Sequence, residues 1–141
     1  MRFFGKSQHT VDDKGRVSLP AKLRKALPDE VVIVPAFGDA LYVFDEKAFV
    51  NWVDMFFNKE DGYNQRDEMD RKLHARLFST AQSVNVDAAG RVKLSPTHRQ
   101  KAGIGKDVII TGCDDHVEIW DPAKYEAFMG EDTPLEDLLG N

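Results

Sequence analysis

An internal repeat constrains the fold of this chain more than any other feature. The stretch "VDDKGRVSLPAKLRKAL" at residues 11–27 returns as "VDAAGRVKLSPTHRQKA" at residues 86–102. The alignment rests on pairs of identical residues: Asp12 and Asp87, Gly15 and Gly90, Arg16 and Arg91, and Arg24 and Arg99. Such a repeat indicates that one structural unit is used twice. The function should therefore lie in what the two copies share and in where they differ.

The second half of each copy also aligns. "DEVVIVPAFGDALYVFDEKAF" at residues 29–49 corresponds to "KDVIITGCDDHVEIWDPAKY" at residues 106–125. In each copy, apolar runs around turn residues predict two strands, a short helix, two further strands and a second helix. Strands in such small units have exposed edges, so we expect the two copies to pair and cover them.

Local residues set the expected boundaries of these elements. Residues 7–20 are expected to form a hairpin in which Gly15 supplies the positive φ of the turn. The helix that follows is expected over residues 21–27. The expected helix ends in the rest of the chain are N-caps at Asp45, Ser95 and Asp121, a proline at the first helical position at Pro96, and a stop at Gly103.

The pattern divides the chain into four parts: a first unit at residues 1–60, a helical connector at 61–79, a second unit at 80–130 and a polar tail at 131–141. The first unit is expected to end in a long amphipathic helix over residues 46–59. The connector is predicted to be a helix because Met69, Leu73 and Leu77 recur at helical spacing.

Length and composition limit the class of protein. With 141 residues, the chain fits one domain, or two small ones that must pack together to bury a core. No apolar run approaches the roughly 18 residues of a membrane span, and the first residues lack the apolar region of a signal peptide. The single cysteine, Cys113, excludes an intramolecular disulfide framework and a multi-cysteine zinc site. We expect a cytoplasmic protein in a reducing compartment.

Charge is segregated along the chain. The net charge of −5 and the isoelectric point near 5.3, taken alone, disfavour a nucleic-acid partner. Residues 1–28 nevertheless carry a net +5 and residues 71–106 a net +7, whereas residues 29–70 and 107–141 carry −8 and −9. The basic blocks contain the two "GR" turns and could steer a polyanion to one face. The alternative is that acidic and basic blocks neutralise one another across an oligomer interface.

These motifs resemble those of a known family. "VDDKGRVSLPAKLRKAL" and "VDAAGRVKLSP" resemble the paired DxxxR signatures of the MraZ family, and each is similar to the looped-hinge, swapped-hairpin unit of the AbrB and MazE type. The early "FFGKSQHTVDDKGR" and the late "VEIWD" extend the resemblance over essentially the whole chain. The resemblance implies an α+β fold of tandem duplicated, swapped-hairpin (AbrB/MazE-like) β-barrel units with flanking helices.

The resemblance also implies a function. MraZ-like proteins are cytoplasmic, nucleoid-associated transcriptional regulators that form ring-shaped homo-oligomers, and they are not enzymes. The implied partner is double-stranded promoter DNA of the division and cell-wall gene cluster, with short G-containing direct repeats. The second copy departs from the first in having Ala88 for Asp13, Ala89 for Lys14 and Ser95 for Pro20. We therefore do not expect the two turns to share DNA contact equally.

Arg16 is the first candidate for DNA contact. It follows a glycine in a tight turn, and its planar guanidinium can bind O6 and N7 of guanine together, or a phosphate. The alternative is that Asp12 pairs with Arg16 across the turn and makes the signature a structural clamp. For Arg91 the clamp is the preferred interpretation, because its turn carries alanines. We assign four residues to hairpin geometry: Asp12, Gly15, Asp87 and Gly90.

Other cations extend the basic segment of the first copy. Lys14 lies at the turn and is expected to contact phosphate, with a plainly solvated side chain as the alternative. Lys6, Lys22, Arg24 and Lys25 are expected to be mainly surface charges. Arg24 is the first of these four to expect on a phosphate.

Binding strength implies an oligomer. One small hairpin buries too little surface for tight, specific binding, which takes on the order of 1,000 Å². A ring that presents one turn from each subunit to a repeated operator gains strength by avidity. The long helix has the composition of a subunit interface, with ordinary core packing as the alternative, at Phe49, Trp52, Val53, Phe56 and Phe57.

Other function classes find less support in the sequence. A metal or hydrolytic site needs converging ligands or a nucleophile with an oriented base. Cys113 and His116 in "CDDH" are the only candidates, and an Asp-rich turn needs no metal to explain it. We expect no metal, no cofactor and no small-molecule substrate. The stronger rival is a protein-interaction module, such as an antitoxin-like protein whose acidic tail grips a partner.

Overall fold

The computed structural model describes residues 2–57, 62–130 and 133–140. Its strands are β1 (Lys6–Thr10), β2 (Arg16–Ser18), β3 (Glu30–Ala36), β4 (Ala40–Phe44), β5 (Gln82–Asn85), β6 (Arg91–Lys93), β7 (Asp107–Cys113) and β8 (His116–Trp120). Its helices are α1 (Ala21–Ala26), α2 (Glu46–Met55), α3 (Glu68–Thr80), α4 (Pro96–Ala102), α5 (Pro122–Met129) and α6 (Leu135–Leu138). Each copy follows the order expected from the repeat, with α3 between the copies.

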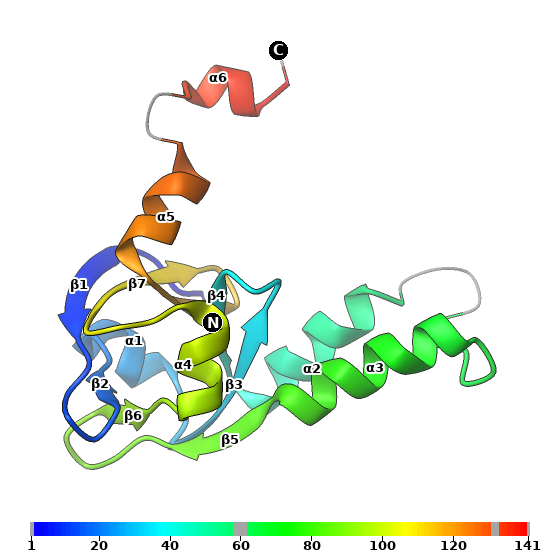
Figure 1. Ribbon diagram of the computed structural model, residues 1–141, viewed down its shortest axis with the longest axis horizontal. Coiled ribbons are helices and arrows are strands. Elements are labelled where there is room, and N and C mark those ends of the chain that lie inside the picture. The colour runs from blue at the N-terminus through cyan, green and yellow to red at the C-terminus, as the bar shows by residue number, and fades with distance from the viewer. Residues whose placement is uncertain (1, 58–61, 131–132, 141) are drawn as a thin grey trace.

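Strand pairing joins the two copies instead of closing each copy on itself. A six-stranded sheet has the order β1-β7-β8-β4-β3-β5, and β2 and β6 form a separate two-stranded ribbon (Figure 1). The pairs β1–β7, β3–β5 and β2–β6 each combine one strand from each copy, and all are antiparallel. The expectation of a local hairpin over residues 7–20 was therefore wrong. β1 and β2 lie in different sheets, because each covers an edge of the other copy.

The larger sheet is open in the described part of the chain. β1 and β5 form its two edges, and no pairing between them is found there. The α+β class and the antiparallel sheets are confirmed, whereas the barrel implied by the resemblance is not. The four-part division of the chain stays a prediction.

Several expected helix ends are confirmed. Asp45 accepts a hydrogen bond from the backbone N–H of Ala48 at 2.7 Å, and Asp121 caps α5 in the same way. Ser95 caps α4, which begins at Pro96, and α4 ends at Gly103 with a φ of 68°. α1 ends one residue earlier than expected.

The ribbon packs its inner face onto the larger sheet. Val17 in β2 and Val92 in β6 are fully buried and directly paired. They belong to one cluster with apolar residues of the larger sheet, among them Val31, Ile33, Leu41, Val43, Val108, Ile110, Val117 and Ile119. Since side chains alternate along a strand, the neighbours of the two valines point away from this core.

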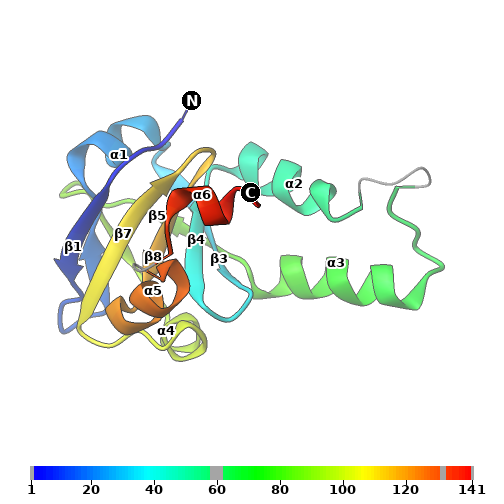
Figure 2. The same ribbon diagram turned by 90° about the horizontal axis from the view of Figure 1, so that it is seen from above.

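Helices α2 and α3 extend side by side from the sheet as an arm (Figure 2). Four residues on and just after α2 are buried against β3 and β4, so core packing accounts for them: Phe49, Trp52, Val53 and, beyond the helix, Phe57. Phe56 is more than a third exposed. Residues 58 and 59 of the expected long helix lie outside the described residues.

Helix α3 is the helix expected from the spacing of Met69, Leu73 and Leu77, and it begins at Glu68. Asp67 caps it by accepting from the backbone N–H groups of Met69 and Asp70 at 2.9 and 3.2 Å. Of the expected apolar positions, Leu77 packs on the cluster beneath α2, while Met69 and Leu73 are exposed.

Helix α6 lies within the expected polar tail and follows α5 away from the sheet (Figure 1). Its apolar positions, Leu135, Leu138 and the following Leu139, are all exposed. Residues 131, 132 and 141 of that tail lie outside the described residues.

Candidate nucleic-acid interface

The turn that precedes β2 is closed by Asp12. One carboxylate oxygen accepts the backbone N–H groups of Lys14 and Arg16, both at 2.9 Å, and the other accepts Arg16 Nε–H at 2.8 Å. Gly15 has a φ of 79°, which favours glycine. The hydrogen bond from the backbone N–H of Arg16 is the main reason that the pKa of Asp12 is lowered, and the hydrogen bond from the Arg16 side chain adds to it. Asp12 and Gly15 therefore shape the turn.

The second copy repeats this turn. Asp87 accepts the backbone N–H groups of Ala89 and Arg91 at 3.0 and 2.8 Å, and Arg91 Nε–H at 2.8 Å. Gly90 has a φ of 81°. The clamp is thus present in both copies, although the second turn carries alanines.

The clamp uses only one edge of each arginine. It engages Nε, and no hydrogen bond from Nη1 or Nη2 of Arg16 or Arg91 is found among the described residues. The two side chains are 30% and 33% exposed. The clamp and DNA contact are therefore compatible, because the carboxylate orients a fork whose tip stays accessible.

The outer side of the ribbon is basic. Arg16 pairs with Lys93, and Ser18 pairs with Arg91, on the side opposite Val17 and Val92. We call Arg16, Arg91 and Lys93 the basic face. Figure 1 shows the ribbon at the end of the molecule opposite the α2–α3 arm. Lys14 is exposed in the adjoining turn.

Each turn is held by the other copy. Leu94 donates its backbone N–H to Gly15 at 2.8 Å, and Leu19 donates to Gly90 at 2.9 Å. The guanidinium of Arg24 on α1 lies against Gly90, so closely that a Cβ there would collide with it. Beside this contact is a groove of about 630 Å³, lined by Arg24 and by residues 85–88 ahead of Gly90. Arg24 therefore lies beside the second turn and not beside the turn of its own copy.

Two cations near the turns were missed from the sequence. Arg99 on α4 approaches Gly15, as Arg24 approaches Gly90, and the repeat already equated Arg99 with Arg24. Lys93 could have been found from strand alternation, since it is two residues from Arg91.

Lys6 is not brought to the basic face. It begins β1, pairs with Thr111, and its ammonium lies 5.4 Å from the ring centre of Tyr125. Asp12 comes six positions after Lys6 along an extended segment, which is a distance of roughly 20 Å. Its predicted DNA contact has no support from this geometry.

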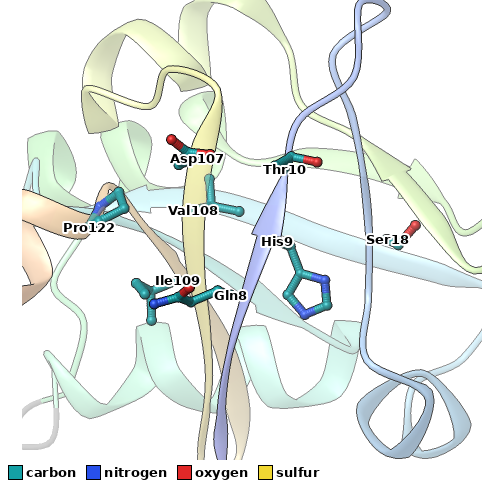
Figure 3. A pocket seen from close by; sticks show the side chains of 8 residues that line it. All are labelled: Gln8, His9, Thr10, Ser18, Asp107, Val108, Ile109 and Pro122. Carbon is teal, nitrogen blue, oxygen red and sulfur yellow. The ribbon is translucent and has the colours of Figure 1, made fainter.

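A hollow of about 570 Å³ over the paired strands β1 and β7 has no arrangement typical of an active site (Figure 3). It is lined by His9, Ser18 and Asp107, among other residues. His9 lies 2.8 Å from the hydroxyl of Ser7, and among the described residues no hydrogen bond links His9, Ser18 and Asp107. A nucleophile oriented by a base is therefore not found here.

A helix that could cross the bilayer is absent from the described ranges, where each helix is too short or too polar.

Comparison with known proteins identifies the family of this chain. A family described as "MraZ protein, putative antitoxin-like" matches residues 2–72 and 77–138. The chain is 32% identical to the transcriptional regulator MraZ of Spiroplasma kunkelii, over 100% of this chain and 96% of that protein. It is also 32% identical to the protein of that name from Mycoplasmoides gallisepticum, over 89% and 86%, and 34% identical to that of a Roseiflexus species, over 88% and 84%. These relatives are named for transcriptional regulation, in agreement with the expectation of a non-enzymatic protein. The chain belongs to the MraZ family.

Proposed function

We propose that this protein is a sequence-specific DNA-binding regulator of transcription that contacts duplex DNA through the basic face of the β2–β6 ribbon. The observation that carries the proposal is the outward alternation of Arg16, Arg91 and Lys93 opposite the buried valines. The major groove of B-DNA admits a two-stranded ribbon, so this face has a shape and a charge that fit it.

The arginines suit a G-containing operator. The clamp to Asp12 or Asp87 fixes the guanidinium before DNA arrives, and a pre-oriented fork loses less entropy when it binds O6 and N7 of guanine. Lys14, at the exposed turn, is positioned for a phosphate, as is Arg24 beside the second turn. We propose short direct repeats in the promoter of the division and cell-wall gene cluster as the target, and nucleoid DNA in the cytoplasm as the place of action.

We further propose that copies assemble into a ring. Phe37 is 70% exposed, and its ring meets the partly exposed ring of Phe56 edge to face at 6.1 Å. Phe37 in the β3–β4 turn and Phe56 just after α2 thus form a small exposed apolar patch. Several copies joined in this way would bind several repeats at once and gain affinity by avidity.

Fluorescence anisotropy across a salt series tests the proposed function. The duplex comes from upstream of the gene, and a shuffled duplex of the same length and composition is the reference. Arg16→Ala should weaken binding to the native duplex by about 1–3 kcal/mol, which is roughly 5- to 150-fold. Arg16→Lys should keep the salt dependence but lose the preference for the native duplex, because lysine keeps the charge and lacks the fork.

Arg71→Ala, an exposed arginine on α3, is the matched control and should bind as wild type does. Circular dichroism and light scattering establish that each variant remains folded and assembled. If neither duplex binds at low salt, the proposed function is wrong. If Arg16→Ala binds as well as wild type, the clamp is purely structural.

A protein-interaction role is the second candidate. The acidic α6 exposes Leu135, Leu138 and Leu139, which suits the docking of a basic partner with an apolar surface. A small basic protein that copurifies with the full chain, and is lost from a Leu138→Ser variant, would favour this role.

A further inference from the structure

The β7–β8 hairpin gathers three metal-ligating side chains on one face. Cys113 ends β7 and pairs directly with His116, which begins β8. Alternation along β8 places Glu118 on the side of His116, while Val117 and Ile119 enter the core. Within the residues that the structure describes, these three side chains form a group whose ligand atoms all lie within 4.8 Å of one another. The side chains of His116 and Glu118 are only 12% and 13% exposed, and Cys113 is partly buried.

Hydrogen bonds already orient the imidazole and the carboxylate. His116 Nε2 lies 2.7 Å from one oxygen of Glu118, and Nδ1 lies 2.7 Å from Oδ1 of Asp115. Trp120 donates its indole N–H to the other oxygen of Glu118 at 2.8 Å. Tyr42 stacks on the imidazole with ring centres 4.4 Å apart. Outer partners of this kind fix ligand orientation in metal sites, and a carboxylate on the far nitrogen of the histidine is one of the recurrent ones.

We propose that Cys113, His116 and Glu118 bind a divalent transition-metal ion of the zinc class. A thiolate, an imidazole and a carboxylate suit zinc or cobalt, whereas magnesium and calcium prefer oxygen ligands alone. Ligand atoms bonded at about 2.0 to 2.3 Å in a tetrahedral site lie roughly 3.3 to 3.7 Å apart. The observed separations, from 2.7 Å to no more than 4.8 Å, bracket these values. Solvent completes the fourth position.

The ion takes the place of two protons. Coordination needs a thiolate and a free lone pair on Nε2, so the thiol proton of Cys113 and the proton of the Nε2–Glu118 hydrogen bond pass to the solvent when the ion binds. Nδ1 stays directed at the carboxylate of Asp115.

This proposal reverses our expectation of no metal site. "CDDH" contains two of the three ligands, and the third is supplied two residues later by strand alternation. The ion joins β7 to β8 across the turn at Asp114, to which Phe3 is bonded through two backbone hydrogen bonds of 2.7 and 3.1 Å. Loading therefore stabilises the part of the sheet that holds the N-terminal segment.

Cobalt(II) titration of the untagged, reduced full-length protein tests the proposal. Cys113 is the only cysteine, so a thiolate-to-cobalt charge-transfer band in the near ultraviolet identifies it as a ligand without any variant. We expect one cobalt per chain with this band, displacement of cobalt by zinc, and a rise in the thermal midpoint with added zinc. No band at saturating cobalt, or cobalt uptake without the band, overturns the proposal.

Variants assign the other ligands. His116→Gln and Glu118→Gln should each weaken cobalt binding strongly, and Asp115→Asn should raise the dissociation constant about 10- to 100-fold. His9→Gln removes a half-buried histidine from β1 and should leave the band unchanged. A band that survives His116→Gln at full strength contradicts the assignment, and circular dichroism identifies any variant that is not folded.

Discussion

Leu19 donates its backbone N–H to the carbonyl oxygen of Gly90, at 2.9 Å, so a strand of the first copy holds the turn of the second. The reciprocal bond from Leu94 to Gly15 holds the first turn. The arginine in each turn is therefore positioned by residues from both copies. A destabilising substitution in either copy should change the structure of both turns.

Gly90→Ala should destabilise the fold by about 1–3 kcal/mol. The φ of 81° disfavours any residue with a Cβ, and that Cβ would collide with the guanidinium of Arg24. Urea unfolding measures the loss. In the double variant Gly90→Ala, Arg24→Ala the collision is gone, and about 1–2 kcal/mol should remain from the backbone alone.

Gly105→Ala is the control for this prediction. Gly105 lies outside the positive-φ region, and no atom would meet its Cβ within 4 Å. It should change stability by no more than about 0.5 kcal/mol. Equal effects at Gly90 and Gly105 would contradict the role assigned to the turn.

Lys93→Ser should reduce the salt dependence of DNA binding. If Lys93 on the basic face neutralises one phosphate, its removal lowers the slope of log K against log salt by about 0.9. Anisotropy at several salt concentrations gives the slope. Lys72→Ser, on the arm, removes the same charge away from the ribbon, and its slope should match that of the wild type.

His98 should make stability depend on pH. It is 2% exposed, and its Nε2 lies 2.7 Å from the carbonyl oxygen of Thr80. Burial lowers the pKa of His98, Thr80 opposes this, and the charge of Lys101 adds to the lowering. Because the folded-state pKa is lowered, neutral His98 contributes its full stability above the unfolded pKa of about 6.5. That stability is lost as the pH falls through the folded-state pKa.

The measurement is the free energy of unfolding between pH 7.5 and 5, which is about the range over which an unfolded histidine titrates. It should fall more steeply for wild type than for His98→Gln. Burial also lowers the pKa of His9. The variant His9→Gln therefore shows how much of the pH dependence comes from His9 and not from His98. Parallel curves for wild type and His98→Gln would refute the assignment.

Phe37→Asn should weaken assembly and leave the monomer folded. Phe37 has a φ of 58°, and asparagine tolerates this region better than most residues, so the change removes the apolar ring without adding strain. Light scattering should find smaller species than in wild type. Phe4→Ser, at another exposed phenylalanine, should assemble normally, and unchanged assembly of Phe37→Asn would exclude the patch as the interface.

Elements and caps could be predicted from the sequence because their signals are local. The N-caps at Asp45, Ser95 and Asp121 depend on a few neighbouring residues, and each is found. Strand partners are not local. The turn at Gly15 looks the same in sequence whether its flanking strands pair with each other or with the other copy, and packing of Val17 against Val92 decides between them.

The site was predicted in part for the same reason. The short DxxxR motif predicts the two arginines, Arg16 and Arg91, together with the aspartates that bind them, Asp12 and Asp87. Lys6 was grouped with the arginines only because it is near them in the sequence. Arg24 was counted with the basic segment of the first copy, but its guanidinium lies against Gly90 in the turn of the second copy. Glu118 joins Cys113 and His116 only once the hairpin register is known.

The pairing of β2 with β6 within one chain has a further consequence. An assembly of two identical chains would present identical residues on both strands, and any substitution would appear twice. Here Lys93 faces outward where the first copy has Ser18, and Ala89 stands where the first copy has Lys14. Because both strands belong to one polypeptide, each can change alone, and a single molecule can present unlike halves to a site that is itself not palindromic.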